Sequence, residues 1–210
     1  MKPDRLQHLL SVAGNCRLLV LGDVMLDEFV WGTVSRISPE APVPVVEVLE
    51  ESSYPGGAAN VARNLRPFCA GVHLCGLVGT DPHAAKLRDL LSVERIATDA
   101  LVADPERPTI VKTRIVARQQ QVVRVDREQR GVASESIIDQ ACEAVTALIP
   151  SVDGVIFEDY GKGFLNQSLK DRVTAIAKDS GKFISADPNP MNPLNWTGVD
   201  LLKPNRLEAF

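Results

Sequence analysis

One stretch decides the fold of this chain: Tyr54-Pro55-Gly56-Gly57-Ala58-Ala59-Asn60-Val61-Ala62-Arg63-Asn64-Leu65. The proline and the two glycines predict a turn, and the residues after them have the pattern of a helix. Glycine permits close backbone approaches that a Cβ atom would block, and a helix start presents N–H groups with a partial positive charge. A polar or anionic ligand therefore finds a suitable backbone here, with the Asn60 amide beside it. The alternative is an ordinary glycine turn before a core helix, and only the rest of the chain distinguishes the two.

The composition of the 210-residue chain indicates a protein with a substantial apolar core and no affinity for nucleic acid or membrane. Apolar residues make up 45% of the chain, and the net charge of −4 argues against general nucleic-acid binding. No apolar run reaches the about 18 residues of a membrane span, and the polar start of the chain lacks a signal-peptide core. The cysteine spacings match no zinc or redox motif, so we expect reduced core cysteines and a cytoplasmic protein. The cysteines are Cys16, Cys69, Cys75 and Cys142.

Apolar runs alternate with helical patterns, which predicts an α/β fold with a doubly wound, mostly parallel sheet flanked by helices. Continuous apolar runs predict buried strands at residues 17–22, 72–79, 155–157, 183–186 and 199–202. Helical spacing of apolar residues predicts helices at 4–13, 58–68, 82–92, 134–148, 166–180 and from 206 onward.

Polar side chains follow four of these predicted strands. Because the carboxyl ends of parallel strands meet at the sheet edge where ligands bind, we expect them to form one site. They are Asp23 and Asp27, Asp159 and Lys162, Asp187 and Asn189, and Asn205 and Glu208. For Asp23 and Asp27, the alternative is that the carboxylates make ordinary hydrogen bonds within a loop.

Two further segments, about 29–50 and 108–127, predict a small β-sheet lid beside the main sheet. The first contains three prolines followed by β-branched residues, which is typical of extended edge strands. The second alternates with a period of two, which would place Lys112, Arg114 and Arg118 on one face. Such a face is suited either to binding a phosphate or to contact with water alone. We expect residues 109–117 and 122–126 to pair with 43–48 in one separate sheet.

Together, these motifs resemble the ribokinase-like (pfkB) carbohydrate kinases along essentially the whole chain. The family-wide motifs are residues 22–27 (GDVMLD), 55–62 (PGGAANVA), 159–163 (DYGKG) and Asn205-x-x-Glu208. Residues 35–45 (SRISPEAPVPV) are more specific, and they are most similar to kinases that phosphorylate heptose 7-phosphate for lipopolysaccharide synthesis. Gln119-Gln120 and Arg124-Val125-Asp126 support this narrower resemblance.

The resemblance implies a role for each matching position. The sugar phosphate would be held by Asp27, Gly56, Gly57, Asn60, Asp159 and Lys162, with its phosphate at Lys112, Arg114 or Arg118. ATP would be placed by Asn189, Asn205 and Glu208, and Mg²⁺ by Glu208. One departure concerns the nucleotide contact, because close relatives often have Lys where this chain has Asn189.

The family's Gly-Ala-Gly-Asp element, whose Asp is the general base toward the attacking hydroxyl, does not occur in these 210 residues. We therefore expect residues 1–210 to be the N-terminal part of one kinase domain, with the rest of the ATP site and the catalytic base beyond them. The isolated chain would then be inactive. In the complete protein, the resemblance implies ATP and Mg²⁺ as cofactors, a sugar phosphate as acceptor, and a homodimer formed through the lid.

Two alternatives remain open. The complete protein could act on another phosphorylated sugar or a nucleoside, or the chain could be a non-catalytic sugar-phosphate-binding or dimerisation module that uses the lid as its interface. A dinucleotide-dependent oxidoreductase is disfavoured, because Gly22-Asp23-Val24 lacks the Gly-x-Gly-x-x-Gly turn.

Overall fold

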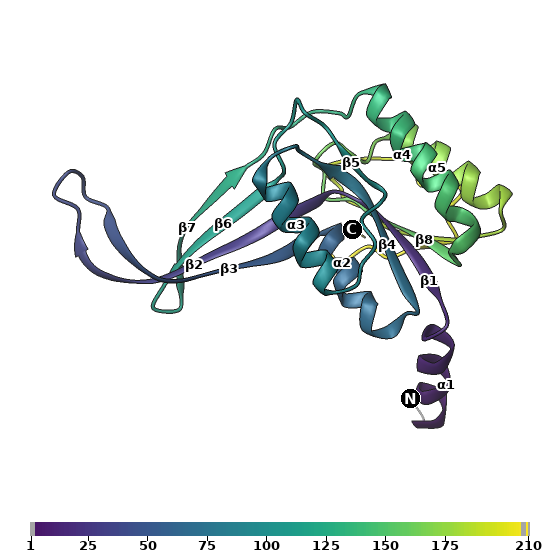
Figure 1. The fold of residues 1–210 in the computed structure, drawn as a ribbon, viewed down its shortest axis with the longest axis horizontal. Helices are drawn as coiled ribbons and strands as arrows, with labels where there is room; N and C mark the ends of the chain where they lie inside the picture. Colours follow the sequence, from purple (N-terminus) through teal and green to yellow (C-terminus); the bar gives the residue numbers. More distant parts are fainter. Residues whose placement is uncertain (1–2, 207–208, 210) are drawn as a thin grey trace.

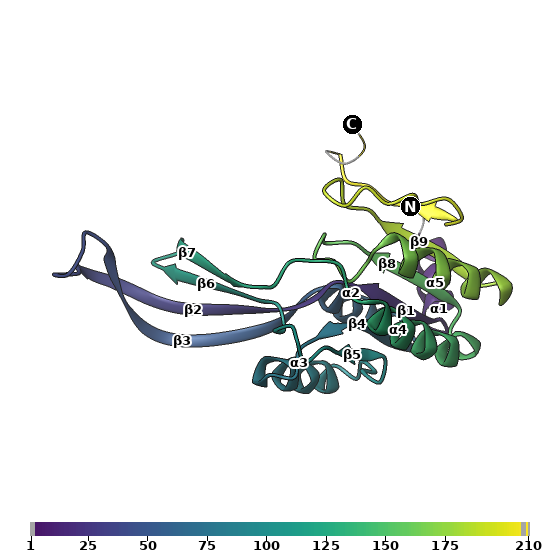
Figure 2. The same ribbon diagram turned by 90° about the horizontal axis from the view of Figure 1, so that it is seen from above.

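Two β-sheets organise the protein, which is described here by a computed structural model for residues 3–206 and 209. The larger sheet has six parallel strands in the order β10-β9-β8-β1-β4-β5, and the smaller has four strands in the order β3-β2-β6-β7. Figure 1 shows the smaller sheet, which we call the lid, as an arm that extends away from the larger sheet. Viewed from above, the tip of this arm lies far from both chain ends (Figure 2).

The predicted doubly wound α/β fold is confirmed. The strands of the larger sheet are β1 (Arg17–Gly22), β4 (Gly71–Val78), β5 (Leu101–Ala103), β8 (Gly154–Glu158), β9 (Phe183–Asp187) and β10 (Leu201–Leu202). The helices are α1 (Pro3–Ala13), α2 (Ala58–Leu65), α3 (Pro82–Val93), α4 (Glu135–Leu148) and α5 (Gln167–Asp179), with short 3₁₀ turns η1 (Arg66–Phe68) and η2 (Ile149–Ser151). The helix expected from residue 206 onward lies largely outside the described residues.

Alternating residues of β1 join two different apolar cores. Leu19 and Leu21 pack in one cluster with apolar residues of α4 and α5, while Val20 belongs to a second cluster with residues of α2 and α3. Helices therefore cover both faces of the larger sheet, as expected for parallel strands joined by helical crossovers. No helix in the described part of the chain is long and apolar enough to cross a membrane.

The lid forms one separate sheet, as predicted, but its pairing differs from the prediction. Its strands are β2 (Val24–Ile37), β3 (Pro44–Gly57), β6 (Val111–Ala117) and β7 (Gln120–Arg127). The 109–117 segment pairs with β2, which separates it from β3. The β2–β3 register shifts between Trp31 and Gly32 and again between Val34 and Arg36, which marks two irregularities toward the tip.

The expected glycine turn is in fact the end of a strand. Gly56 and Gly57 are the last residues of β3, and α2 begins at Ala58. Gly57 has a φ of +57°, a backbone conformation that favours glycine. The Ala58 N–H donates to the Asp23 carbonyl over 3.0 Å, so this helix start is already tied to the end of β1.

The alternative that Asp27 is an ordinary loop residue after the first strand does not hold. Only Asp23 separates β1 from β2, so the chain passes from the larger sheet into the lid and Asp27 lies within β2. The segment stays extended because β3 and β6 pair with it on either side, and a single sequence does not reveal such long-range partners.

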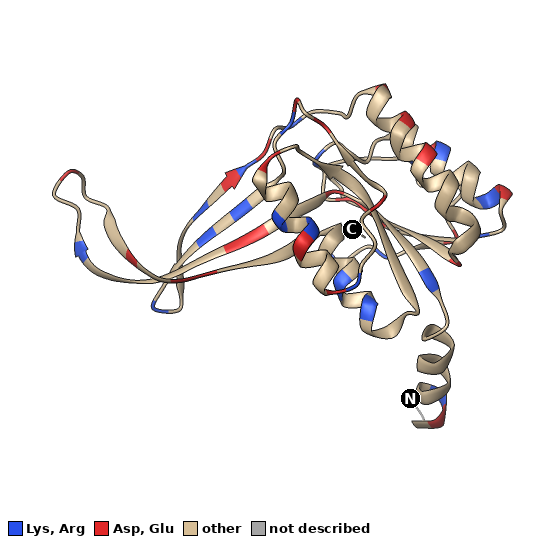
Figure 3. Ribbon diagram, in the orientation of Figure 1, with Lys and Arg blue, Asp and Glu red and all other residues tan. Residues whose placement is uncertain are grey.

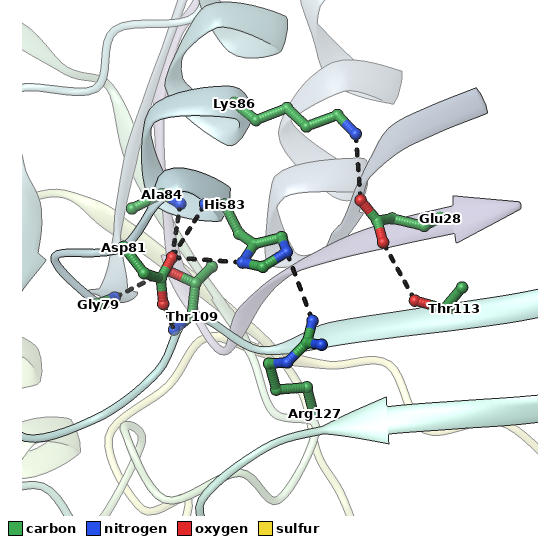
Figure 4. A network of polar contacts seen from close by, with 9 residues as sticks. All are labelled: Glu28, Gly79, Asp81, His83, Ala84, Lys86, Thr109, Thr113 and Arg127. Atoms are coloured by element: carbon green, nitrogen blue, oxygen red, sulfur yellow. Dashed lines mark hydrogen bonds and ion pairs between the residues drawn. The ribbon is translucent and has the colours of Figure 1, made fainter. Parts of the chain in front are cut away.

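Polar contacts connect one face of the lid to α3, near the root of the arm (Figure 4). Lys86 of α3 donates to Glu28 over 3.1 Å, and Glu28 accepts a second hydrogen bond from the Thr113 hydroxyl. Asp81, the predicted cap of α3, also accepts from the Thr109 N–H over 2.7 Å. These contacts leave the opposite face of the lid turned toward the carboxyl end of the larger sheet.

Candidate active site

Asp27 lies directly beside Gly56 on this opposite face, which we call the inner face of the lid. A Cβ atom at Gly56 would overlap the Asp27 carboxylate, so the close approach requires glycine. Asp27 accepts a hydrogen bond from the Arg114 guanidinium over 2.6 Å, and the two side chains are 23% and 24% exposed. The structure therefore brings together the predicted sugar carboxylate, the glycine motif and a lid cation.

The strand register places Lys112 and Arg114 on the inner face, as the alternation predicted. Asp27 is opposite Lys112, and Phe29 is opposite Arg114, so these four side chains point to the same side. The Arg114 guanidinium lies 5.3 Å from the centre of the Phe29 ring, which positions the cation over an aromatic face. Figure 3 shows the resulting basic bands on β6 and β7 beside an acidic band on β2.

Arg118 does not lie on this face, and that part of the prediction is wrong. Arg118 and Gln119 form the two-residue turn between β6 and β7, with φ values of +47° and +70°. Positive φ at both positions suits the tight hairpin turns that match strand twist. The alternation of β6 ends at Ala117 because the chain reverses there, which leaves Arg118 exposed at a hairpin tip.

Lys112 differs electrostatically from the other cations of the site. Arg114 is paired with Asp27, and Lys162 is paired with Glu128 over 2.7 Å. In the described part of the chain, Lys112 forms no ion pair. Partial burial lowers the pKa of Lys112, and the nearby Lys162 ammonium lowers it further. An anion placed between the two lysines would relieve this repulsion.

Asp159 and Lys162 come from the loop that follows β8, as the sequence predicted. The Asp159 carboxylate is buried and accepts hydrogen bonds from the Gly161 N–H over 2.8 Å and the Asn192 amide over 2.9 Å. Burial raises its pKa to about 6. The Lys162 ammonium reaches Glu128, just after β7, and so connects this loop to the lid.

Asn60 lies in the first turn of α2 and is exposed. Arg63, one turn further along the helix, stacks on the Tyr54 ring at 5.6 Å from its centre. Tyr54 is opposite Asp27 in the lid register, and residues three apart share a helix face. The Asn60 side of α2 therefore adjoins the inner face of the lid.

Asp23 has a different position from Asp27. It is only 1% exposed, and its carboxylate accepts backbone hydrogen bonds from Tyr160, Lys162 and Phe164. The Asp23 carboxylate therefore does not make the hydrogen bonds within its own loop that the alternative described, because its partners lie in the distant loop after β8. Asp23 faces the protein interior and not the site.

A pocket of about 470 Å³ lies at the ends of β8, β9 and β10. It is lined by Glu158, Asp159, Tyr160, Asp187, Pro188, Asn189, Pro190, Lys203 and Asn205. Two predicted nucleotide residues, Asn189 and Asn205, therefore share one pocket beside Asp159. Glu208, the third, lies outside the described residues.

Three carboxyl groups line this pocket, those of Glu158, Asp159 and Asp187, together with the Lys203 ammonium. Burial and the neighbouring Asp187 raise the pKa of Glu158 to about 7, and Asp187 pairs with Lys203 over 2.8 Å. The pocket therefore offers the oxygen ligands that Mg²⁺ prefers. Three residues able to hold a metal do not come together anywhere in the described ranges. The fit to Mg²⁺ is partial, and it is compatible with an ion that keeps several waters and takes few protein ligands.

Glu128 and the aromatic row of the lid are features that the sequence reading missed. Glu128 binds Lys162, and Phe29 stacks on Trp31 with ring centres 5.4 Å apart. The signal for the aromatic row was present, because Phe29 and Trp31 are two residues apart and so share a strand face. Glu128 carried no comparable signal, since its partner is distant in the sequence.

The profile described as pfkB family carbohydrate kinase matches residues 16–209. The chain therefore belongs to the pfkB family of carbohydrate kinases, which confirms the resemblance inferred from the motifs. The family is named for kinases that act on carbohydrates.

Curated proteins similar to this chain carry the name "Bifunctional protein HldE". The chain is 41% identical over 199 residues to the protein from Desulfatibacillum aliphaticivorans, and 42% identical over 206 residues to that from Caulobacter vibrioides. The alignments cover 95% and 98% of this chain but only 41% and 42% of those proteins. The chain thus spans about two-fifths of the length of these relatives.

Solved structures show the same fold at low sequence identity. The protein Sa239 superposes with a TM-score of 0.69 at 19% identity, covering 93% of this chain and 62% of that one. Escherichia coli phosphofructokinase-2, in its tetrameric inhibited form, gives 0.67 at 17%, covering 92% and 62%. Arabidopsis thaliana ribokinase, complexed with ribose and ATP, gives 0.64 at 16%, covering 92% and 61%.

Proposed function

We propose that the complete protein containing this chain transfers a phosphoryl group from ATP to heptose 7-phosphate, at the anomeric hydroxyl. The observation that carries the proposal is the Asp27–Gly56 contact, which sits beside Lys112 and Arg114 on the inner face of the lid. Support for the heptose comes from residues 35–45, which resemble heptose 7-phosphate kinases, and from the similarity to proteins named HldE.

In this proposal, Asp27 accepts hydrogen bonds from two sugar hydroxyls. Gly56 and Gly57 allow the sugar ring to approach the backbone closely, and Asn60 adds an amide from the start of α2. Arg114 orients the Asp27 carboxylate through the 2.6 Å contact. Asp159 and Lys162 close the other side of the sugar from the loop after β8.

The phosphate of the acceptor binds at Lys112. Arg114 is already committed to Asp27, and Arg118 lies in the hairpin turn. Lys112 is half-buried, has no ion pair among the described residues, and lies near Lys162. A dianionic phosphate would neutralise the Lys112 ammonium and offset its repulsion by Lys162, and this gives sugar phosphates an advantage over unphosphorylated sugars.

ATP binds across the pocket at the ends of β8, β9 and β10, with Asn189 and Asn205 toward its phosphates. Mg²⁺ supplies charge neutralisation for the transferred phosphoryl group when it is bound. We assign Glu208 to this ion because of the family motif Asn205-x-x-Glu208. Glu208→Gln in the complete protein should raise the Mg²⁺ concentration needed for half-maximal activity, and an unchanged Mg²⁺ titration contradicts the assignment.

We also propose that the protein acts in the cytoplasm as a homodimer joined through the lid. Ile37, Val43, Val48 and Leu49 expose apolar side chains toward the tip of the arm, and an open sheet with such edges favours pairing with a second copy. Light scattering of the complete protein should give the mass of a dimer. Charge substitutions at Val48 and Leu49 should shift the measured mass toward the monomer.

The direct test is ADP release by the complete purified protein with ATP, Mg²⁺ and heptose 7-phosphate. Fructose 6-phosphate, a nucleoside and unphosphorylated heptose serve as competing acceptors. We expect a kcat/KM at least about tenfold higher for heptose 7-phosphate, and phosphorus NMR should place the new phosphate on the anomeric carbon. A stronger preference for another acceptor contradicts the assignment of the heptose. The 210-residue chain alone should show no turnover, because it lacks Gly-Ala-Gly-Asp.

A second candidate function is a non-catalytic sugar-phosphate-binding or dimerisation module. Membership of the pfkB family does not favour it, although all the proposed sugar-side residues lie within this chain, from Asp27 to Lys162. Calorimetry with heptose 7-phosphate in the absence of ATP distinguishes the two functions. Binding by the complete protein without any turnover would favour the module.

A further inference from the structure

Asp23 connects three separate pieces of the site through five hydrogen bonds. Its N–H donates to the Glu158 carbonyl over 3.3 Å, and its own carbonyl accepts from the Ala58 N–H over 3.0 Å. Its carboxylate accepts from the N–H groups of Tyr160 and Lys162 over 3.0 Å each, and from that of Phe164 over 3.2 Å. One residue thus contacts the end of β8, the start of α2 and the loop after β8.

The loop that receives the Asp23 carboxylate has no regular structure of its own. Gly161 and Gly163 have φ values of +64° and +94°, so the backbone bends sharply at two places within three residues. Backbone N–H groups in such a loop need partners other than helix or sheet ladders. Asp23 supplies the acceptor for three of them, and the loop carries Asp159 and Lys162.

Burial of this carboxylate is costly unless hydrogen bonds compensate for it. Asp23 is 1% exposed, and burial raises its pKa, while the three N–H groups and the Lys162 ammonium act in the opposite direction. A buried charge that binds only one loop adds little to the stability of a fold, because its burial costs free energy. It is effective, however, for fixing the position of one loop against another segment, because charged hydrogen bonds are strong and directional.

We propose that Asp23 is a positioning residue of the kinase reaction: its carboxylate fixes the Asp159–Lys162 side of the sugar site against the Gly56–Gly57 side. The catalytic consequence rests on the proposed function, and the geometric part does not. The Asp23 carbonyl binds the start of α2, and the Asp23 carboxylate binds the loop 160–164. Hydrogen bonds to one residue therefore position both sides of the proposed sugar site. A displacement of about 1 Å between the two sides would cost roughly 100-fold in rate.

The test compares Asp23→Asn with wild type in the complete protein. The neutral amide keeps the size of the side chain and one acceptor oxygen, but it replaces the other oxygen by an N–H₂ donor, so at least one of the three loop N–H groups loses its acceptor. We expect amide hydrogen exchange at 160–164 to accelerate about tenfold or more, with exchange in α4 unchanged. The kcat/KM for the sugar phosphate should fall roughly 100-fold, while the Kd for an ATP analogue stays within about twofold of wild type.

Asp153→Asn is the matched control. Asp153 also accepts a backbone hydrogen bond, from the Arg17 N–H over 2.6 Å, but at the opposite end of β1. It should leave the loop exchange and the kcat/KM of the sugar phosphate near wild-type values. Asp23→Ser is a second variant, which removes the carboxyl and leaves space for water if the asparagine disrupts folding.

Three results would overturn the proposal. The first is wild-type exchange at 160–164 in Asp23→Asn, and the second is an unchanged kcat/KM despite a loosened loop. The third is global unfolding of both Asp23 variants, because that assigns Asp23 to the stability of the whole domain. If the wild-type protein phosphorylates no sugar phosphate, the proposed function fails, while the exchange experiment still decides whether Asp23 fixes the loop.

Discussion

Arg114 reaches diagonally across the lid to Asp27, and its guanidinium lies over the Phe29 ring on the way. The guanidinium and carboxylate meet at 2.6 Å, and the cation is 5.3 Å from the centre of the ring. Two independent contacts therefore fix the cation that orients the proposed sugar carboxylate.

Asp27→Asn in the complete protein should weaken sugar-phosphate binding by about 10- to 100-fold. The substitution removes the charge that strengthens hydrogen bonds from sugar hydroxyls, worth about 1.5–3 kcal/mol. Calorimetry should show an unchanged Kd for an ATP analogue. Glu47→Gln is the control, because Glu47 bonds to Ser35 in the outer part of the same lid. Equal losses of sugar and nucleotide binding would mean that Asp27 is structural.

Lys112→Gln should selectively weaken binding of phosphorylated acceptors. We expect the Kd for heptose 7-phosphate to rise at least about tenfold, while the Kd for unphosphorylated heptose stays nearly unchanged. Arg118→Gln removes a lid cation that lies in the hairpin turn, and it should affect neither ligand. If Arg118→Gln has the larger effect, the assignment of the phosphate to Lys112 is wrong.

Gly56→Ala should disrupt the sugar site more than its small size suggests. The added methyl group would overlap the Asp27 carboxylate, so Asp27 and Arg114 have to move. Overpacking of this kind destabilises a protein by about 1–3 kcal/mol, and we expect loss of sugar binding in addition. Gly71→Ala is the control in β4, where the nearest neighbours are flexible Arg17 side-chain atoms at 3.6 Å. Urea titration and calorimetry on the same samples measure both effects.

Glu158→Gln should make the protein relatively more stable as the pH rises. The pKa of Glu158 is raised to about 7 by burial and by Asp187, so the folded state favours the protonated carboxyl. The protonated Glu158 carboxyl contributes to the free energy of unfolding. This contribution is fully present below the ordinary carboxyl pKa and is lost as the pH rises through about 7. The stability of the variant minus that of wild type should therefore increase between about pH 5 and pH 8.

Urea titrations at each pH, with EDTA and without Mg²⁺, measure this difference. Glu143→Gln on α4 controls for the loss of an exposed carboxylate. A difference that is constant with pH, or that falls as the pH rises, would contradict the raised pKa of Glu158.

Most of the larger sheet was predictable from the sequence because its central strands are buried on both faces, whereas both residues of β10 at its edge are exposed. Runs such as 17–22 and 155–157 are then continuously apolar, and each ends at polar residues that the parallel arrangement brings to one edge. Asn189 and Asn205 line one pocket for this reason. The family motifs extended these expectations to individual residues such as Asp27.

The lid was harder to predict because its order depends on pairing between distant segments. Alternation placed Lys112 and Arg114 on one face, but it did not reveal that β2 separates β3 from β6, or that the chain reverses at Arg118. The contacts of Asp23 with loop 160–164 and of Lys162 with Glu128 also join residues that no local pattern relates. Such long-range contacts decide the geometry of the site.

The two register shifts between β2 and β3 have a mechanical consequence. The root of the lid is held by its chain connections to β1 and α2 and by the contact of Glu28 with Lys86 of α3, and a bulge is the point where a paired ribbon bends most easily. The first shift follows Trp31, on the side of the lid tip. Asp27 and Phe29 therefore lie in the stiffer part of the lid, between this shift and the larger sheet. A force at the tip, such as the docking of another molecule, will therefore bend the outer span before it displaces the residues proposed to hold the sugar.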